Sequence, residues 1–341
     1  MFGEVLCDLF AHRVGEPLAE TGAFVPLQGG APANVAVQLA RLGVPTTLVT
    51  AVGHDPLGAR LTASLAKDGV DTACVLVRKE RRTGVTLVEV DDDGERRFFG
   101  FRENSADLSL GRDDVQGAAV IRALASAAIV HTGTVSLRSA SARQATTALQ
   151  KAARKAGALV SLDVNLRPGM FPSLALLLRL ARSAVTRVDV VKATRDEAAQ
   201  LLGLAPPRRA SAAALRAHDD VLVDGLLALG PRLALLTLDE HGAVVATRRA
   251  RARVPAPRVE AVDATGAGDG FVGAVLAELA SAALDRRALD ALGEGELAAL
   301  GVVGCRAGAA VVTAVGATTA MIRGRPVGIL APRPRQRIDR A

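Results

Sequence analysis

The stretch that decides the fold reads Val262-Asp263-Ala264-Thr265-Gly266-Ala267-Gly268-Asp269-Gly270-Phe271. Its small residues and glycines precede a long apolar stretch with helical spacing, so backbone N–H groups gather at a helix N-terminus and can hold phosphate oxygens. Gly266 and Gly268 allow close backbone approach, and Asp269 follows where an attacking hydroxyl could lose its proton. The competing interpretation is a glycine-rich turn with Asp269 as a helix cap. A Walker A loop is excluded, because no Gly-Lys-Ser/Thr follows.

Two further segments place polar groups at a helix start and near a strand end. Gly29-Gly30-Ala31-Pro32-Ala33-Asn34 combines a double glycine with Pro at an early helical position, and Asn34 offers both a donor and an acceptor to sugar hydroxyls. Gly3-Glu4-Val5-Leu6-Cys7-Asp8 is strand-like with Asp8 near its end, where open α/β sheets bind ligands. Each segment alone also fits ordinary turn and cap chemistry.

Helix and strand patterns alternate along most of the chain. We expect strands at 46–52, 127–131, 158–164, 188–192 and 233–238, and helices at 32–42, 57–67, 140–155, 173–184, 196–202 and 267–283. This alternation predicts right-handed βαβ crossovers, and hence an α/β fold with a doubly wound, mostly parallel sheet flanked by helices.

Two segments with strand character interrupt the alternation. Residues 83–90 and 95–102 flank Asp91-Asp92-Asp93-Gly94, which is typical of a β-hairpin turn, and residues 11–28 could supply a short strand pair. We expect a small β lid from about 11–28 and 83–102 on a single domain of residues 1–330, followed by a basic tail at 331–341. The arginines of 248–253 are interpreted as a solvated loop.

Composition excludes several classes of protein. The 341 residues are 50% hydrophobic and 23% charged, with no Trp or Tyr. The missing aromatic platforms argue against nucleic-acid binding by stacking. The net charge of +7 most simply reflects an arginine-rich composition, although an anionic substrate would also suit it. Three unpaired Cys and five scattered His argue against a disulfide framework or a zinc site. Residues 307–322, the longest late uncharged run, are too few to span a bilayer. We expect a cytoplasmic protein with neither a membrane nor a nucleic-acid partner.

The three segments, in this order, resemble the ribokinase-like PfkB family of carbohydrate kinases, from Gly3 to about Met321. The Gly-Ala-Gly-Asp-Gly-Phe signature at 266–271 and the Gly-Gly-Ala-Pro-Ala-Asn-Val-Ala segment at 29–36 carry the resemblance together, and the second is most similar to fructokinases. Supporting pieces are 52–55, 83–85, 94–98, 101–102, 106–107, 131–133, 163–167 and 190–192 with Glu197. The resemblance implies a ribokinase-like fold and ATP-dependent phosphorylation of a sugar hydroxymethyl group, with fructose 6-phosphate as the favoured product.

The resemblance also implies roles for individual residues. Asp269 matches the catalytic base, and Gly266, Ala267 and Gly268 match the anion hole. The sugar ligands implied are Asp8, Gly29, Gly30 and Asn34, with Arg102 reaching over the sugar from the lid and Arg167 near the phosphate or the sugar rim. The residues implied on the side of ATP and Mg²⁺ are Lys192, Thr194, Glu197 (through waters), Thr237, Asp239, Gly242 and Arg306. Asp263 and Thr265, with the backbone of 312–320, match a loop for a monovalent cation, K⁺.

Departures from the family pattern gather on the nucleotide side. The family's Asn three residues before Glu197 is Thr194, a Thr-Leu-Gly turn reads Thr237-Leu238-Asp239, and an Asn near adenine is Arg306. Asp239 would bring negative charge towards the nucleotide, which Arg306 could offset by stacking on adenine. The first strand of the family pattern should also begin several residues before Met1, so either that strand is short here or the start is misassigned.

Three functions stay open. The favoured one is a fructokinase-like enzyme. The second is a kinase of the same family for another substrate such as 2-keto-3-deoxygluconate, whose carboxylate would suit the arginine-rich composition. The third is a non-catalytic sugar-binding protein, motivated by the nucleotide-side departures but opposed by the intact Asp269. Lid strands in this family also imply a homodimer through the lid.

Overall fold

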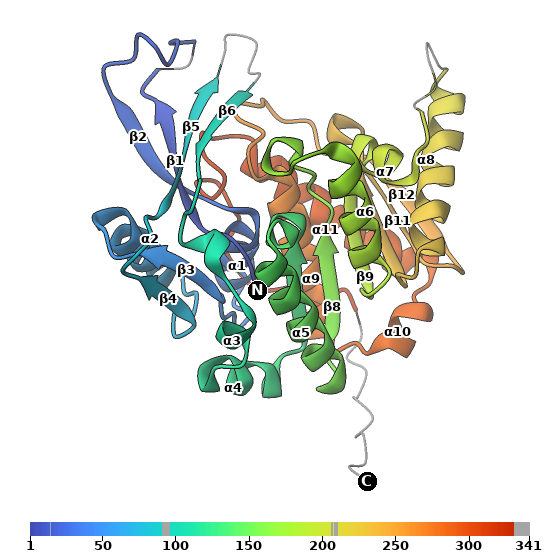
Figure 1. The fold of residues 1–341 in the computed structure, drawn as a ribbon. Helices are drawn as coiled ribbons and strands as arrows, with labels where there is room; N and C mark the ends of the chain where they lie inside the picture. The colour runs from blue at the N-terminus through green and yellow to red at the C-terminus, as the bar shows by residue number, and fades with distance from the viewer. Residues whose placement is uncertain (14, 91–95, 206, 208–210, 331–341) are drawn as a thin grey trace.

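The computed structural model consists of a central sheet between two layers of helices, with a smaller sheet projecting from one end (Figure 1). It describes residues 1–13, 15–90, 96–205, 207 and 211–330. The turn expected at 91–94 and the tail expected at 331–341 lie outside this part.

The strands are β1 (Leu6–Ala11), β2 (Phe24–Gly29), β3 (Thr50–Gly53), β4 (Val75–Arg78), β5 (Gly84–Val90), β6 (Arg96–Phe101), β7 (Ile129–Gly133), β8 (Leu159–Asp163), β9 (Val190–Thr194), β10 (Leu233–Thr237), β11 (Ala243–Ala246) and β12 (Arg251–Val254). The α-helices are α1 (Ala31–Arg41), α2 (Pro56–Lys67), α3 (Arg112–Val115), α4 (Ala118–Ser126), α5 (Ala140–Lys155), α6 (Leu174–Val185), α7 (Arg195–Leu202), α8 (Ala212–Ala228), α9 (Ala267–Ser281), α10 (Arg286–Asp290) and α11 (Glu294–Val311). Among these helices none is long and apolar enough to cross a membrane.

The main sheet has the strand order β12-β11-β10-β9-β8-β7. Strands β7 to β10 are parallel, and β11 and β12 add an antiparallel edge. Phe2 lies next to β7, where it forms a parallel bridge to Thr132 on one side and to Val49 on the other. This single residue therefore connects the main sheet to the segment that leads into β3. The parallel pair β3–β4 follows on that side. The expected doubly wound, mostly parallel α/β fold is confirmed.

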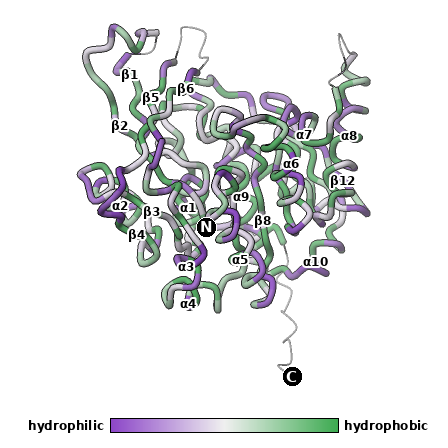
Figure 2. Tube along the Cα trace, viewed as in Figure 1, coloured by the Kyte–Doolittle hydropathy of each residue, from purple (hydrophilic) through white to green (hydrophobic). Residues whose placement is uncertain are grey.

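Apolar residues alternate between the two faces of the sheet and so build two cores. Leu162 of β8 packs in a core with α5 to α8, whereas Leu159 of the same strand packs in the core of α1, α9 and α11. The sequence of a strand that is buried on both faces is a nearly continuous run of apolar residues. Figure 2 shows the green of hydrophobic residues along most of β8.

The lid is a four-stranded sheet with the order β2-β1-β5-β6, seen at the upper left of Figure 1. Its first strand corrects the expectation of a core strand over 3–8. The bridges to Val49 and to Thr132 of β7 are formed by Phe2, before this segment, and pairing with β2 and β5 begins at Leu6. Asp8 therefore lies within a lid strand, opposite Leu27 and Thr86, rather than at the end of a core strand.

The structure also corrects the interpretation of the arginines of 248–253 as a solvated loop. Arg251 to Val254 form the edge strand β12, not a loop, because exposed Arg251 and Arg253 alternate there with buried Ala252 and Val254. Arg253 also reaches the buried carboxylate of Asp219 at 2.7 Å. Charged side chains on an edge strand disfavour pairing with other chains.

Candidate active site

The N-terminus of α9 is shaped by Gly266, its N-cap residue. Gly266 has a φ of 81°, and a Cβ there would lie 2.6 Å from the Cβ of Ala317, so both the backbone and the space require glycine. The amide of Ala267 donates a long 3.3 Å hydrogen bond to the carbonyl of Ala264. The next amides, of Gly268 and Asp269, belong to the first helical turn, where intrahelical acceptors are lacking. Such N–H groups at a helix N-terminus are suited to hold an anion.

Asp269 lies in this first turn and is buried. Its Oδ2 accepts a 2.8 Å hydrogen bond from Nδ2 of Asn34 on α1. Burial raises the pKa of Asp269 to about 7, with a smaller contribution from Asp163, against the opposing effects of Asn34, Lys192 and Arg167. A carboxyl group with a pKa near neutrality is suited to accept a proton from an alcohol.

Lys192 and Asp163 form a buried ion pair beside this helix end. Lys192 Nζ lies 3.2 Å from Asp163 Oδ2, and a Cβ on Gly268 would approach Lys192 Nζ to 2.6 Å. The ammonium group therefore lies across the first turn of α9. Burial alone would lower the pKa of Lys192, but the carboxylates of Asp163, Glu197 and Asp269 outweigh it and raise the pKa. The cation persists at this position over the whole physiological range.

Asp163 is a site residue that the sequence reasoning quoted in a motif without assigning it a role. It ends β8, at the carboxyl edge of a parallel sheet, where ligands of such folds bind. Its Oδ1 is buried without a protein partner, as is Oδ1 of Asn34. Two unpartnered acceptors beside the helix end point to ligand groups that donate to them. The position at a strand end was the signal that could have identified Asp163.

Thr194 and Glu197 cap α7 reciprocally. The Thr194 hydroxyl accepts from the Glu197 amide at 3.2 Å, and Glu197 Oε2 accepts from the Thr194 amide at 2.9 Å. Glu197 Oε1 accepts from the amide of Leu166 at 2.9 Å. The carboxylate thus joins the segments at the ends of β8 and β9, while each oxygen keeps a lone pair for a water.

On the lid side, Asp8 packs directly onto Gly29. A Cβ on Gly29 would collide with Oδ2 of Asp8, and a Cβ on Gly30, which has a φ of 101°, would lie 2.6 Å from the carbonyl of Glu4. The double glycine therefore lets the turn into α1 close around the Asp8 carboxylate. Burial raises the pKa of Asp8 to about 7, although Arg102 and Arg167 oppose it.

The two arginines differ in their surroundings. Arg102, which follows the last residue of β6, forms an ion pair with Asp107, and the two side chains are 10% and 0% exposed. Ser105 holds the other oxygen of Asp107 at 2.6 Å. Arg102 is thus anchored at the base of the lid, and Asp107 is a partner that the sequence reasoning missed. Arg167 lowers the pKa of Asp8, Asp163 and Asp269, so its charge acts on carboxylates of both the lid and the α9 side of the site.

Asp263 ties two loops together next to α9. Its Oδ1 accepts from the amide and hydroxyl of Thr265 at 2.9 and 2.6 Å, and its Oδ2 accepts from the amide of Gly316 at 2.8 Å. The amide of Val262 donates to the carbonyl of Val312 at 2.7 Å. The expected cation-loop residues therefore do lie together with the backbone of 312–316.

The other residues expected on the nucleotide side lie at and after the end of β10 and on α11. Thr237 ends β10, and Asp239 follows with a left-handed φ of 52°. Burial, Glu240 and Asp196 raise the pKa of Asp239. Gly242 is required by the backbone of the β10–β11 turn, because a Cβ there would collide with the carbonyl of Val254. Arg306 is exposed on α11.

Comparison with known proteins identifies the family to which this fold and site belong. The pfkB family carbohydrate kinase model matches residues 1–323. The chain belongs to the PfkB family of carbohydrate kinases. A PfkB protein of this kind is a sugar kinase, which transfers a phosphoryl group to an alcohol group of a carbohydrate.

Individual relatives are fructokinases. The chain is 37% identical to Fructokinase-1 of Oryza sativa subsp. japonica over 275 residues, which is 81% of this chain and 80% of the relative. The structure of fructokinase with bound ATP from Xylella fastidiosa superposes with a TM-score of 0.81 at 31% identity, covering 96% of this chain and 95% of the other. Fructokinase from Vibrio cholerae O395, with fructose, ADP and a calcium ion, gives 0.76 at 27% identity, with 94% of each chain covered.

Proposed function

We propose that this PfkB kinase uses ATP to phosphorylate the 6-hydroxymethyl group of fructose, with Asp269 as general base. The observation that carries the proposal is the placement of a buried carboxyl group with a pKa near 7 in the first turn of α9, at the end of the helix that carries the N–H groups without intrahelical acceptors. The fructokinase relatives support fructose as the sugar.

In this mechanism Asp269 accepts the proton of the sugar hydroxyl while the hydroxyl oxygen attacks the γ-phosphorus. The bond from that phosphorus to the bridging oxygen of ADP breaks as the new bond forms. The amides of Gly268 and Asp269, together with the Lys192 ammonium, stabilise the charge on the transferred group. Asn34 holds the Asp269 carboxylate in position through its 2.8 Å hydrogen bond.

The residues present fit a nucleotide-borne divalent cation. Within the described part of the chain, no three His, Cys, Asp or Glu side chains gather as a metal site. Mg²⁺ would then be held mainly by phosphates and waters, with Glu197 orienting those waters, and would neutralise phosphate charge. Asp263, Thr265 and the backbone of 312–320 would shape the loop for K⁺.

The sugar side fits a neutral ketohexose. Asp8 can accept two hydroxyl hydrogen bonds, Oδ1 of Asn34 is unpartnered, and Gly29 and Gly30 let the backbone approach. Arg102 already pairs with the buried Asp107, so its charge is balanced without a substrate carboxylate. An acidic sugar would instead depend on Arg167, which keeps 2-keto-3-deoxygluconate as the alternative substrate.

A coupled ADP-release assay over fructose, ribose and 2-keto-3-deoxygluconate tests the proposal. We expect the highest kcat/KM with fructose. A higher value with 2-keto-3-deoxygluconate would establish the alternative. Absence of ADP release, with sugar binding retained in calorimetry, would instead show a non-catalytic sugar-binding protein.

We further propose that the protein forms a homodimer through its lid. Several large apolar side chains are exposed on the lid strands: Phe24, Val25, Phe98, Phe99 and Phe101. Phe101 is 68% exposed, and covering such a surface is favourable. Light scattering should give the mass of a dimer for the native chain and that of a monomer for Phe101→Asp. A native monomer would refute this proposal.

A further inference from the structure

The last residue of helix α1 holds the chain that follows α11, which includes the proposed cation loop of residues 312–320. Arg41 Nη1 donates to the carbonyl of Thr318, and also to the carbonyl of Met321 at 3.4 Å. The backbone carbonyl of Arg41 in turn accepts from the amide of Gly324 at 3.0 Å. One residue of α1 is therefore bonded to the loop and to the segment directly after it.

The guanidinium of Arg41 is oriented by Asp68, the C-cap residue of α2. Arg41 Nε and Nη2 donate to the two oxygens of Asp68 at 2.8 and 3.0 Å, and the two side chains are 9% and 10% exposed. Such a two-pronged pair fixes the direction of the guanidinium plane, which leaves Nη1 aimed at the loop carbonyls. The Asp68 carboxylate also balances a positive charge that would otherwise repel a cation in the loop.

The loop is held from its other side by the segment before α9. Asp263 Oδ2 accepts from the amide of Gly316 at 2.8 Å. Between this bond and the bonds from α1, Ala317 packs against the N-cap residue of α9, since a Cβ on Gly266 would lie 2.6 Å from the Cβ of Ala317. A shift of the loop of residues 312–320 would therefore be felt at the N-terminus of α9.

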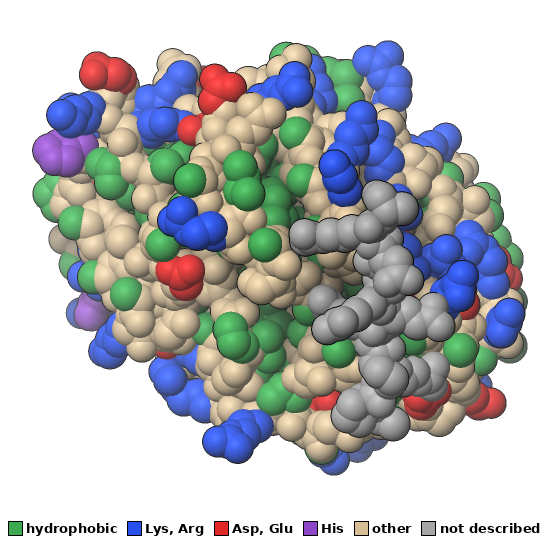
Figure 3. Space-filling view, turned by 90° about the horizontal axis from the view of Figure 1, so that it is seen from below, with side chains coloured by type: hydrophobic (Ala, Val, Ile, Leu, Met, Phe, Trp, Pro, Cys, Tyr) green, Lys and Arg blue, Asp and Glu red, His purple; other side chains and the backbone are tan. Residues whose placement is uncertain are grey.

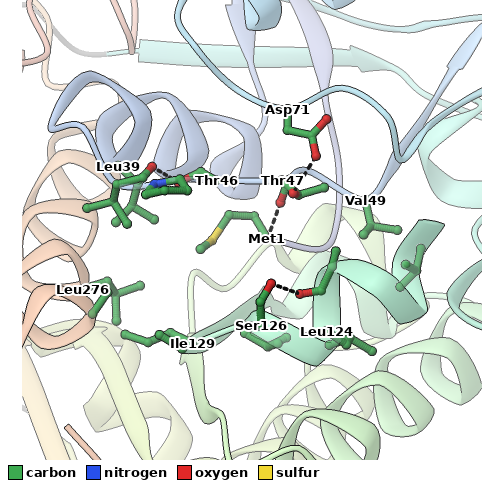
Figure 4. Close-up of a pocket in the computed structure, with 18 of the residues that line it drawn as sticks. Met1, Leu39, Thr46, Thr47, Val49, Asp71, Leu124, Ser126, Ile129 and Leu276 are labelled. Carbon is green, nitrogen blue, oxygen red and sulfur yellow. Dashed lines mark hydrogen bonds between the residues drawn. The ribbon is translucent and has the colours of Figure 1, made fainter. Parts of the chain in front are cut away.

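The opposite face of the same turn of α1 borders a cavity of about 590 Å³ instead of the loop. Figure 3 looks onto this end of the molecule, where apolar side chains surround the centre of the face. Figure 4 shows the side chains of Leu39, Leu276 and Met1 around the hollow. Apolar contacts are non-directional. The orientation of α1 towards the loop is therefore determined by the hydrogen bonds of Arg41, together with a 3.1 Å bond from Gln38 to the same segment.

We propose that Arg41 is a positioning residue for the cation loop, and that its hydrogen bonds to the loop backbone set the affinity for K⁺. The inference rests on the proposed K⁺ loop of residues 312–320. Backbone carbonyl oxygens can replace the hydration shell of K⁺, so the position of the loop backbone governs binding. Arg41 acts through the backbone that it holds and not as a ligand, because a guanidinium is itself a cation without an acceptor.

The test titrates KCl into the native chain, Arg41→Ala, Arg41→Lys and Arg323→Ala, with tetramethylammonium chloride keeping the ionic strength constant. Arg323→Ala is the matched control, because Arg323 Nη2 contacts the same Asp68 carboxylate at 3.1 Å from a 67% exposed side chain. The first readout is the Tm against K⁺ concentration, since a bound ion stabilises the folded chain without any turnover.

We expect the K⁺ midpoint to rise about tenfold in Arg41→Ala, the effect of one or two lost hydrogen bonds. The rise should be smaller in Arg41→Lys, which keeps the charge but not the fork, and absent in Arg323→Ala. Arg41→Lys carries the test if Arg41→Ala does not fold. Hydrogen exchange at the amides of Gly316 and Thr319 should become faster in Arg41→Ala and stay unchanged in the control.

The second readout separates positioning from a merely structural role. The K⁺ concentration that half-activates kcat should move with the midpoint of the Tm curve, while KM for fructose stays the same. A structural role would lower the Tm of Arg41→Ala and leave both K⁺ midpoints in place.

Unchanged K⁺ midpoints in both Arg41 variants, with a native chain that responds to K⁺, would overturn the role of Arg41 alone. An equal shift in Arg323→Ala would overturn it as well, because the charge around Asp68 would then explain the effect. A native chain whose Tm and kcat are both indifferent to K⁺ would instead refute the proposed cation loop, and this inference with it.

Discussion

The side-chain amide of Asn34 donates a 2.8 Å hydrogen bond to the carboxylate of Asp269, which joins the start of α1 to the first turn of α9. The two glycine-rich segments, 235 residues apart in sequence, thereby become one site. The bond favours the charged form of Asp269, while burial favours the neutral form and raises its pKa to about 7.

Replacing Asn34 tests this balance. Asn34→Ala removes a hydrogen bond to the carboxylate, so the pKa of Asp269 should rise further above its value of about 7. Because the base must be deprotonated to act, kcat/KM should increase with pH through neutrality, and the midpoint should move to higher pH in the variant. The measurement is kcat/KM against pH for both proteins. An unchanged midpoint would show that Asn34 does not tune the base.

Replacing Gly268 with alanine tests whether the position of the Lys192 ammonium group matters for turnover. An added Cβ would lie 2.6 Å from Nζ of Lys192, the flexible end of that side chain, so Gly268→Ala should fold but displace the ammonium group. We expect KM for ATP to rise and kcat to fall by about tenfold or more, an effect typical of lost transition-state charge stabilisation. The matched control is Gly295→Ala on α11, where nothing lies within 4 Å. Normal kinetics for Gly268→Ala would remove Lys192 from the phosphate site.

Replacing Asp239 tests whether its negative charge weakens the binding of ATP. Asp239→Asn removes the carboxylate but tolerates the left-handed φ of 52°, and Asp239→Gly removes the whole side chain. If the charge repels phosphate, both variants should lower KM for ATP. Arg306→Asn should raise it if the exposed arginine contacts adenine. ATP titrations decide both points, and a gain in Asp239→Gly alone would assign the effect to the backbone instead.

Variants of Asp8 and Arg102 test which of these two residues binds the sugar. With fructose, Asp8→Ala should weaken binding most, since losing hydrogen bonds to a charged group costs roughly 1.5–3 kcal/mol. Arg102→Lys should mainly lower stability, because it removes the guanidinium group that pairs with the buried carboxylate of Asp107. Calorimetric titration with fructose and a thermal unfolding curve separate the two effects. A larger loss of fructose affinity in Arg102→Lys would place that arginine on the sugar.

Local patterns predicted the alternating elements well, because each carries its own apolar period. The helix over 140–155 and the place of Asp269 in the first turn of a helix are examples. Strands β11 and β12 were missed or taken as a loop, since their short runs have no turn signal and the arginines of β12 hide its two-residue period.

The site was harder to predict where a residue acts through a distant partner. Asp107 beneath Arg102 and Asp163 beside Lys192 acquire their roles only when separate segments meet. Asp8 was assigned to a core strand, because its neighbours read as one apolar run and nothing local shows that pairing passes to the lid at Leu6.

The measurement that tests the central claim most directly is turnover by Asp269→Asn, which keeps the shape of the side chain and removes the base. A positioned general base supplies about 10²–10⁴-fold in rate, so kcat with fructose and ATP should fall at least a hundredfold. Fructose affinity should be retained, and thermal stability above neutral pH should not fall, because a buried charge is no longer formed there. A variant that keeps more than a tenth of the native kcat would contradict the assignment of Asp269 as the general base.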